Sequence, residues 1–135
     1  KRIYRVHCRI ADAYRTGRML LAGDAAHLNS PKGGMGMNGG IHDVFELAEA
    51  LAAIHRGAGD ERLLDRYERR RLPIARDDIL AQADTNRARM AETDPEARRE
   101  ALRNLQAIAV DPERCREFLL RSSMIEGLRR AAEIE

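Results

Sequence analysis

An acidic residue and a glycine-rich loop, close together in the first third of the chain, are the features best suited to chemistry. Asp24 follows Gly23 at the end of the short apolar run 18–22. A carboxylate at the C-terminal end of a strand can accept hydrogen bonds from sugar or polyol hydroxyls, as the acid of a dinucleotide site does. The Gly-Asp pair alone is a weak signal, because turns favour both residue types and a solvated aspartate is as common there.

The glycine-rich loop follows within ten residues of this acid. Five glycines occupy eight positions: Gly33, Gly34, Gly36, Gly39 and Gly40. Because glycine has no Cβ, several backbone N–H groups can approach a ligand there, beside the positive N-terminus of the helix expected next. These features favour an anion, or a carbonyl that becomes anionic. A reduced flavin is such a ligand, since its charge gathers near N1 and the C2 carbonyl oxygen.

The loop does not match the common phosphate-binding patterns. No Gly-Lys-Ser/Thr sequence follows the glycines, as the pattern G-x-x-x-x-G-K-[ST] requires. Residues 34–39 do spell G-x-G-x-x-G, but a loop containing Pro31 precedes them where the dinucleotide fingerprint needs a strand. The glycines therefore predict close backbone approach to a ligand without predicting a phosphate.

The histidines and cysteines form no recognisable catalytic or metal-binding pattern. His27 lies near Asp24, but no serine or cysteine stands at a triad-like position, so we expect His27 to cap the turn. The other three histidines lack H-x-x-x-H or H-E-x-x-H spacing, and Cys8 and Cys115 lack the spacing of metal ligands. We expect no catalytic residue and no metal site in this chain.

Two further sets of charged residues have ordinary structural explanations. Asp43 lies near the start of the expected helix, where the helix dipole accounts for an acid. The three arginines at 69–71 span most of a helical turn and cannot all face one ligand. We expect them to be solvated and to pair with Asp65, Glu68 or Asp78.

Two strands and a helix are expected to position the acid and the loop. Alternating residue types over 3–10 predict a half-exposed strand, and the apolar run 18–22 predicts a buried one. Apolar residues at i, i+3, i+4 and i+7 predict a helix from about residue 40 to about residue 56, ending near Gly57.

More helices should follow. A second begins after Asp60 and should kink or restart at Pro73. Asp-Pro-Glu sequences at 94–96 and 111–113 are helix-start signatures. The predicted fold class is α+β, mainly α, with short N-terminal strands and a Gly-rich loop followed by four or five helices. Residues 1–57 would hold the strands, the loop and the first helix, and residues 58–135 a C-terminal helical region.

Composition limits the partners. At 135 residues, 44% hydrophobic and 34% charged, the chain fits one globular domain, and its net charge of +2 gives no reason to expect nucleic acid. Its apolar runs are far shorter than the roughly 20 residues of a membrane span. Two distant cysteines indicate reduced thiols and a cytoplasmic location.

The order of residues around the loop resembles the second flavin-binding motif of the para-hydroxybenzoate hydroxylase family of FAD-dependent monooxygenases. Residues 17–27 read Gly-Arg-x-x-Leu-x-Gly-Asp-Ala-Ala-His, residues 31–40 read Pro-x-x-Gly-x-Gly-x-Asn-x-Gly, and an Asp follows early in the helix. Residues 64–73 are similar to the family's downstream L-x-x-Y-x-x-x-R-x-P helix. The resemblance implies the C-terminal part of a Rossmann-type FAD-binding monooxygenase fold.

The resemblance also implies roles for individual residues. Asp24 would hydrogen-bond the ribityl chain of FAD, and Pro31 would lie where the loop passes the isoalloxazine and the substrate pocket. The backbone N–H groups of Met37 and Asn38 would face the flavin N1 and C2 carbonyl oxygen. Three glycines would allow the backbone to approach the cofactor: Gly33, Gly34 and Gly36.

An enzyme of this family uses NAD(P)H to reduce FAD, and a flavin C4a-hydroperoxide then delivers oxygen from O2 to an aromatic small molecule. The family's N-terminal strand-GxGxxG-helix unit and its middle Asp-Gly motif have no counterpart in these residues. We therefore expect the chain alone to be inactive. One alternative is a non-catalytic helical fragment that forms a homodimer, because its exposed apolar face is satisfied by self-association and its unpaired strand edges invite pairing with another copy. Another is a related flavoprotein oxidoreductase.

Overall fold

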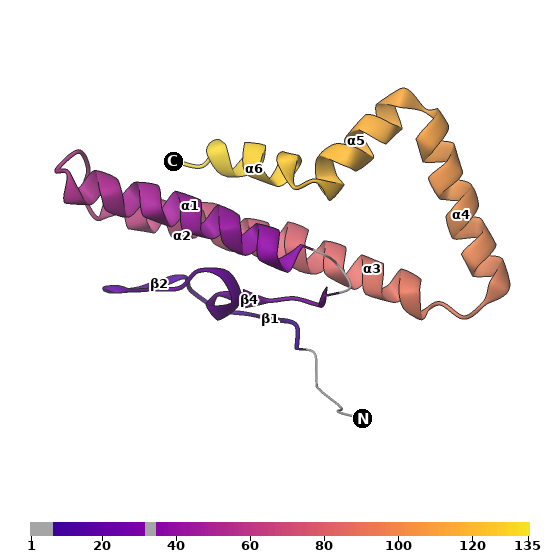
Figure 1. Cartoon of the computed structure of the whole chain (residues 1–135), viewed down its shortest axis with the longest axis horizontal. Coiled ribbons are helices and arrows are strands. Elements are labelled where there is room, and N and C mark those ends of the chain that lie inside the picture. The colour runs from indigo at the N-terminus through magenta and orange to yellow at the C-terminus, as the bar shows by residue number, and fades with distance from the viewer. Residues whose placement is uncertain (1–6, 32–34) are drawn as a thin grey trace.

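The structure is a computed structural model that describes residues 7–31 and 35–135. Short strands near the N-terminus lie along one side of an antiparallel helix pair, and the last helix of the chain lies along the other side (Figure 1). Between the helix pair and the last helix, the chain runs outward and returns through three further helices. The predicted class, mainly helical with short N-terminal strands, is confirmed.

Four strands of two residues each form two separate antiparallel pairs. They are β1 (Arg9–Ile10), β2 (Arg15–Thr16), β3 (Met19–Leu20) and β4 (His27–Leu28). β1 pairs with β4, so that Ile10 lies opposite His27, and β2 pairs with β3 across a turn at Gly17, where φ is +59°. A short 3-10 helix, η1 (Gly23–Ala25), separates β3 from β4.

Within the described residues, both predicted strands are shorter than expected. Of the strand predicted over 3–10, only β1 is observed, and residues 3–6 lie outside the described part of the chain. The run 18–22 is not a buried strand, because only Met19 and Leu20 pair and Met19 is 69% exposed. An isolated two-stranded ribbon has no neighbouring strand to extend or cover it, which explains both results.

The first helix starts earlier than predicted. α1 (Gly36–His55) takes in the last three glycines of the loop and ends beside Gly57, where φ is +70°. Glycine has a low helix propensity, so sequence pattern places these residues outside the helix. Tertiary packing keeps them inside, since a Cβ on Gly40 would lie only 3.1 Å from the Cα of Gly23.

The second helix continues through its proline. α2 (Arg62–Ile74) contains Pro73 and passes directly into a π-helical segment, η3 (Ala75–Leu80), and then into α3 (Ala81–Ala91). Proline removes one backbone N–H and crowds the preceding turn, and a π segment is a common way for a helix to absorb such a defect. The predicted kink or restart therefore takes the form of a wider turn just after Pro73.

The predicted helix starts at the two Asp-Pro-Glu sequences are confirmed. α4 (Pro95–Val110) is capped by Asp94, and α5 (Pro112–Ser122) by Asp111. The described residues form six α-helices, against the four or five expected, because Met124 adopts φ +65° and separates α5 from α6 (Ile125–Ala132). No helix in the described residues is long and apolar enough to cross a membrane.

The core is small for the size of the chain. Its buried cluster joins the strands to α2 and the start of α6: Tyr14, Ala26, Met35, Tyr67, Ala75 and Met124. The accessible surface is 9755 Å² for 15.2 kDa, whereas a compact monomer of this mass exposes about 7,000 Å². α4 buries no residue and lies in the outward-running arm of Figure 1. Much apolar surface is therefore left uncovered.

The cap at Asp111 gives a test of this helical arm. Its Oδ1 accepts hydrogen bonds from the N–H groups of Glu113 (3.0 Å) and Arg114 (3.1 Å). We expect Asp111→Ala to lower the free energy of unfolding by about 1 kcal/mol, measured by urea unfolding and far-UV circular dichroism. Asp111→Ser, which keeps a capping oxygen, should retain most of the stability. Equal losses in the two variants would contradict the cap.

Candidate functional site

The turn at Gly23 presents Asp24 to solvent. Gly23 has φ +61°, a conformation that favours glycine, and η1 then begins with Asp24 in its first turn. The Asp24 side chain is exposed, and no cation within the described residues forms an ion pair with it. Its carboxylate is therefore free to accept hydrogen bonds from a ligand.

The first turns of α1 lie against the same segment. A Cβ at position 40 would lie 3.1 Å from the Cα of Gly23, which is a crowded contact, so the helix and the turn meet through two glycines. Gly36 lies beside the side chain of Asn29, whose Oδ1 would be 2.6 Å from a Cβ at that position. The fold thus brings the Gly-Asp motif and the N-terminus of the helix together, although Asp24 and Gly36 are 12 positions apart in the sequence.

Within the described residues, the N-terminus of α1 has no side-chain cap at Met35, and its first turn holds no acid. The N–H groups of a first turn have no acceptor inside the helix, so those of Met37 and Asn38, whose side chains are exposed, can bond to an outside group. Pro31 is also exposed, whereas the two remaining predicted residues, Gly33 and Gly34, lie outside the described residues.

Behind this surface lies a buried carboxylate that the sequence did not reveal. Asp43 is fully buried, and its Oδ2 accepts the Gly23 N–H at 3.0 Å and faces Nε2 of His27 at 2.7 Å. Its Oδ1 accepts Nε of Arg71 at 2.8 Å. The helix-dipole explanation of Asp43 was therefore wrong, because the side chain points into the protein and joins three segments.

His27 was also misread as a turn cap. Its ring is 1% exposed and lies parallel to Tyr14, with ring centroids 6.3 Å apart, while Nε2 bonds to Asp43. Tyr67 closes the cluster and donates its hydroxyl to the Leu21 carbonyl at 2.6 Å. Burial raises the pKa of both tyrosines above the ordinary range, so they remain neutral phenols.

The ionisation of Asp43 follows from its partners. Burial acts to raise its pKa, but the hydrogen bonds from His27 and Arg71, the positive charge of Arg71 and the Gly23 N–H together lower the pKa below its ordinary value. Asp43 therefore remains a carboxylate at neutral pH. A buried charge of this kind is tolerated only when it is paired and hydrogen-bonded.

The three arginines at 69–71 do not share a solvated surface, contrary to the sequence interpretation. Arg71 is fully buried against Asp43, Arg70 bonds to Glu46 at 3.2 Å and to the Ile134 carbonyl at 2.6 Å, and Arg69 bonds to the Glu135 main-chain oxygen. Successive residues on a helix point about 100° apart, so each arginine reaches a different neighbour.

The predicted carboxylate partners of these arginines are used elsewhere. Asp65 pairs with Arg15 at 2.7 Å, and Glu68 accepts the backbone N–H groups of Tyr14 and Arg15. The side chain of Asp78, the third predicted partner, lies outside those the structure describes. Asp65 and Glu68 therefore attach the β2 segment to α2.

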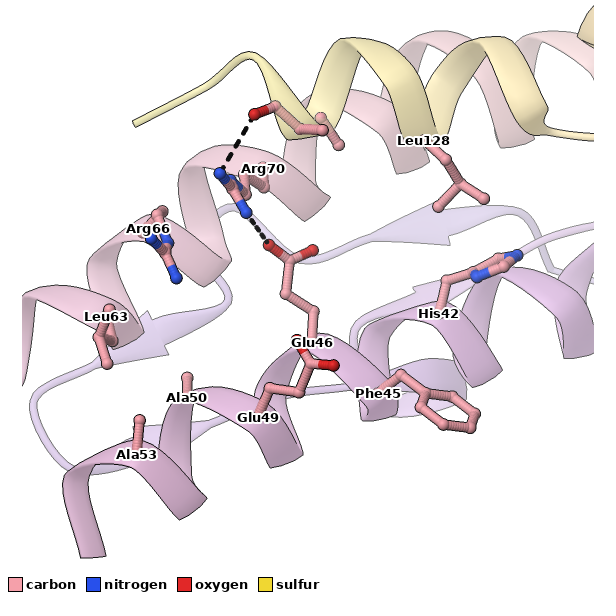
Figure 2. Close-up of a pocket in the computed structure, with 12 residues that line it drawn as sticks. His42, Phe45, Glu46, Glu49, Ala50, Ala53, Leu63, Arg66, Arg70 and Leu128 are labelled. Carbon is pink, nitrogen blue, oxygen red and sulfur yellow. Dashed lines mark hydrogen bonds and ion pairs between the residues drawn. The ribbon is translucent and has the colours of Figure 1, made fainter. Parts of the chain in front are cut away.

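A pocket of about 420 Å³ lies between α1, α2 and α6 (Figure 2), and Asp24 is not among its lining residues. Arg70 spans it by bonding to Glu46 and to the Ala132 carbonyl. Burial, and then the charge of Arg71, lower the pKa of His42 on its wall, so that ring is neutral at pH 7. None of the predicted flavin-contacting residues lines this pocket, so we place the candidate site at the Asp24 surface.

Comparison with known proteins places the chain among flavoproteins. Residues 1–83 match a family model described as an FAD binding domain. Para-nitrophenol 4-monooxygenase of Pseudomonas sp. strain WBC-3 is 37% identical over 126 residues, which are 93% of this chain and 31% of that protein. Pentachlorophenol 4-monooxygenase of Sphingobium chlorophenolicum is 50% identical over 72 residues, 53% of this chain and 13% of that protein.

A solved structure agrees with both matches. The crystal structure of p-nitrophenol 4-monooxygenase from Pseudomonas putida DLL-E4 resembles this fold with a TM-score of 0.82 at 38% identity, over 93% of this chain and 31% of that one. The likeness extends beyond residues 1–83 into the C-terminal helices. The chain spans less than a third of the length of these nitrophenol monooxygenases.

The buried carboxylate predicts a specific loss of stability. Asp43→Asn removes the charge that compensates Arg71, and breaking one side of a buried pair costs about 3–5 kcal/mol. We expect a loss of that order at pH 7, measured by urea unfolding. As a control, Asp84→Asn removes an ion pair with Arg87 that is largely exposed, and should cost less than about 1 kcal/mol. Similar losses in both variants would contradict the role of Asp43.

The lowered pKa of Asp43 makes the free energy of unfolding depend on pH in a definite direction. A carboxyl group whose pKa is lower in the folded state stabilises the fold above its unfolded value of about 4. This stabilisation is lost as the pH falls through the folded pKa. The free energy of unfolding should therefore drop below about pH 4, and drop less steeply in the Asp43→Asn variant. Parallel pH profiles of the two proteins would contradict this assignment.

Proposed function

The chain belongs to the family of FAD-dependent aromatic monooxygenases, and we propose on that basis that it forms the flavin-contacting C-terminal portion of an aromatic-ring hydroxylase. The observation that carries the proposal is the exposed Asp24 carboxylate beside the uncapped N-terminus of α1. One group accepts hydrogen bonds and the other donates them, at the surface where two backbone segments meet.

The residues at this surface fit FAD. Asp24 would accept hydrogen bonds from the ribityl hydroxyls, and the N–H groups of Met37 and Asn38 would donate to the N1 and C2 carbonyl edge of the ring. Gly36 would let the backbone approach the cofactor closely, and Pro31 would border the ring and the substrate. We propose that Gly33 and Gly34 likewise allow close backbone approach to the cofactor.

The bound FAD, reduced by NAD(P)H, would supply the chemistry of hydroxylation with O2. The residues of this chain would bind and orient it, and positive backbone dipoles at α1 would stabilise negative charge on the ring. No side chain here is assigned as an acid, base or nucleophile. The relatives named for p-nitrophenol and pentachlorophenol favour a substituted phenol as the substrate. The free thiols Cys8 and Cys115 fit a cytoplasmic protein.

The proposed site would supply only part of the contacts that bind FAD, and an apolar surface on α1 is left for further contacts. The outward side of α1 exposes a row of large apolar residues, which we call the α1 stripe: Met37, Ile41, Val44, Phe45 and Leu51. A stripe of this spacing normally packs on a core. We propose that it packs against further polypeptide of the kind present in the longer relatives, and that the chain alone is inactive.

A hybrid protein tests the flavin contact. Residues 1–135 would replace the matching segment of the Pseudomonas putida p-nitrophenol 4-monooxygenase, whose fold they share. We expect the hybrid to bind FAD and Asp24→Ala to raise the Kd for FAD by about 10-fold or more, because hydrogen bonds to a charged group contribute about 1.5–3 kcal/mol. The measurement is fluorescence titration of the apoprotein.

Asp12→Ala provides the matched control, because Asp12 is an exposed acid in the same N-terminal part. Its Kd for FAD should not change. A folded hybrid without flavin would contradict the proposed function, and normal FAD affinity in the Asp24→Ala hybrid would remove Asp24 from the site.

The α1 stripe also supports the second reading, in which the chain alone associates with itself as a homodimer. Exposed apolar patches of this kind promote association in water. We expect the purified chain to be colourless and dimeric by sedimentation equilibrium, and Val44→Lys/Phe45→Lys to shift it to monomer. As a control, Leu102→Lys changes an exposed leucine on α4 and should leave the dimer intact. A monomeric parent chain would contradict this prediction.

A further inference from the structure

We propose that Asp43 is a positioning residue that holds Asp24 at a fixed position relative to the N-terminus of α1. The inference rests on the proposed function, because it takes Asp24 and the first turn of α1 as contacts of the same FAD. Asp43 itself is fully buried and would not touch the cofactor. Its role would be exerted through the backbone that carries Asp24.

The bonding pattern brackets Asp24 on both sides. A single oxygen of Asp43, Oδ2, lies 3.0 Å from the N–H of Gly23 and 2.7 Å from Nε2 of His27. Gly23 directly precedes Asp24, and His27 follows it by three residues. One side chain of α1 therefore fixes both ends of the segment from which the exposed carboxylate projects.

Other bonds hold the turn to itself and to β1: the Ala26 N–H bonds to the Gly23 carbonyl at 2.8 Å, the Ala26 carbonyl accepts the Ala11 N–H at 2.8 Å, and His27 pairs with Ile10. The bonds from Asp43 are different, because they join the turn to α1. Gly23 needs a positive φ, and its backbone meets Gly40 of α1. The contact between Gly23 and Gly40 limits how near the turn can come to α1. The Asp43 hydrogen bonds keep the turn from moving away from α1, so the contact and the bonds together set the distance between the turn and the helix.

Arg71 secures the other oxygen of this carboxylate. Its Nε lies 2.8 Å from Oδ1, and both side chains are fully buried. The ion pair joins α2 to α1 and leaves Oδ2 for the turn. Replacing a buried ion pair by apolar residues is often neutral or stabilising, so net stability is a weak explanation for this arrangement. Fixing the geometry of an adjoining site accounts for it better.

Asp43→Asn is the direct test. Asparagine has nearly the same shape, but it has one acceptor oxygen and no charge, so it cannot accept from Gly23, His27 and Arg71 together. His27→Leu is the second variant, and it removes only the bond at the far end of the segment while the Arg71 pair remains. Should the Asp43→Asn hybrid fail to fold, the His27→Leu hybrid decides the question.

The experiment is a double-mutant cycle with Asp24→Ala in the FAD-binding hybrid. We expect Asp43→Asn to raise the Kd for FAD by about 10-fold when Asp24 is present, but by less than about 3-fold when Asp24 is alanine. His27→Leu should show the same dependence on Asp24 with a smaller effect. The midpoint of thermal unfolding should fall equally in both backgrounds, since the loss of stability does not require Asp24.

Two failures can be told apart. If Asp43→Asn raises the Kd by the same factor with and without Asp24, its role is structural only and the inference is overturned. If Asp24→Ala alone leaves the Kd unchanged, the assignment of Asp24 in the proposed function fails, and the inference fails with it.

Discussion

The arrangement of the N-terminal half depends on one buried carboxylate. A charge removed from water must be paired and hydrogen-bonded, and the donors available to Asp43 come from three separate parts of the chain. Gly23 and His27 bring the turn and β4 to α1, and Arg71 brings α2. The small apolar cluster around Tyr14 and Tyr67 packs beside these bonds and excludes water from them. Polar pairing sets the geometry here, and apolar burial supports it.

This constraint gives α1 two different sides. Its buried side carries Asp43 and the glycine contact with Gly23, so the turn lies tightly on the helix. Its N-terminal end has no side-chain cap at Met35, and the neighbouring turn exposes Asp24 to solvent. In the proposed site, the ligand-facing groups would be backbone amides and one carboxylate, placed by residues that do not themselves face the ligand. Such a division suits a cofactor whose own chemistry carries the reaction.

The rest of the molecule is less self-sufficient. α4 buries nothing, the α1 stripe faces solvent, and the total surface exceeds that of a compact monomer of the same mass. The same helical arrangement occurs in a solved monooxygenase about three times longer. Helix caps such as Asp94 and Asp111 define the arm locally, because capping needs only neighbouring residues. The position of the arm relative to the core depends on tertiary contacts, such as those of α5 with α6, and not on these caps.

Local signals in the sequence were enough to predict the mainly helical class, the caps at Asp94 and Asp111, the end of α1 near Gly57 and the family resemblance of residues 17–40. Each depends on residues adjacent in the chain, where propensity and turn chemistry act. The start of α1 at Gly36, the burial of His27 and the separate partners of the three arginines were not predictable in this way. They depend on which segments meet in space. Asp43 shows the reason most clearly: its position in the helix was readable from the sequence, but only the folded chain determines that Gly23, His27 and Arg71 surround it.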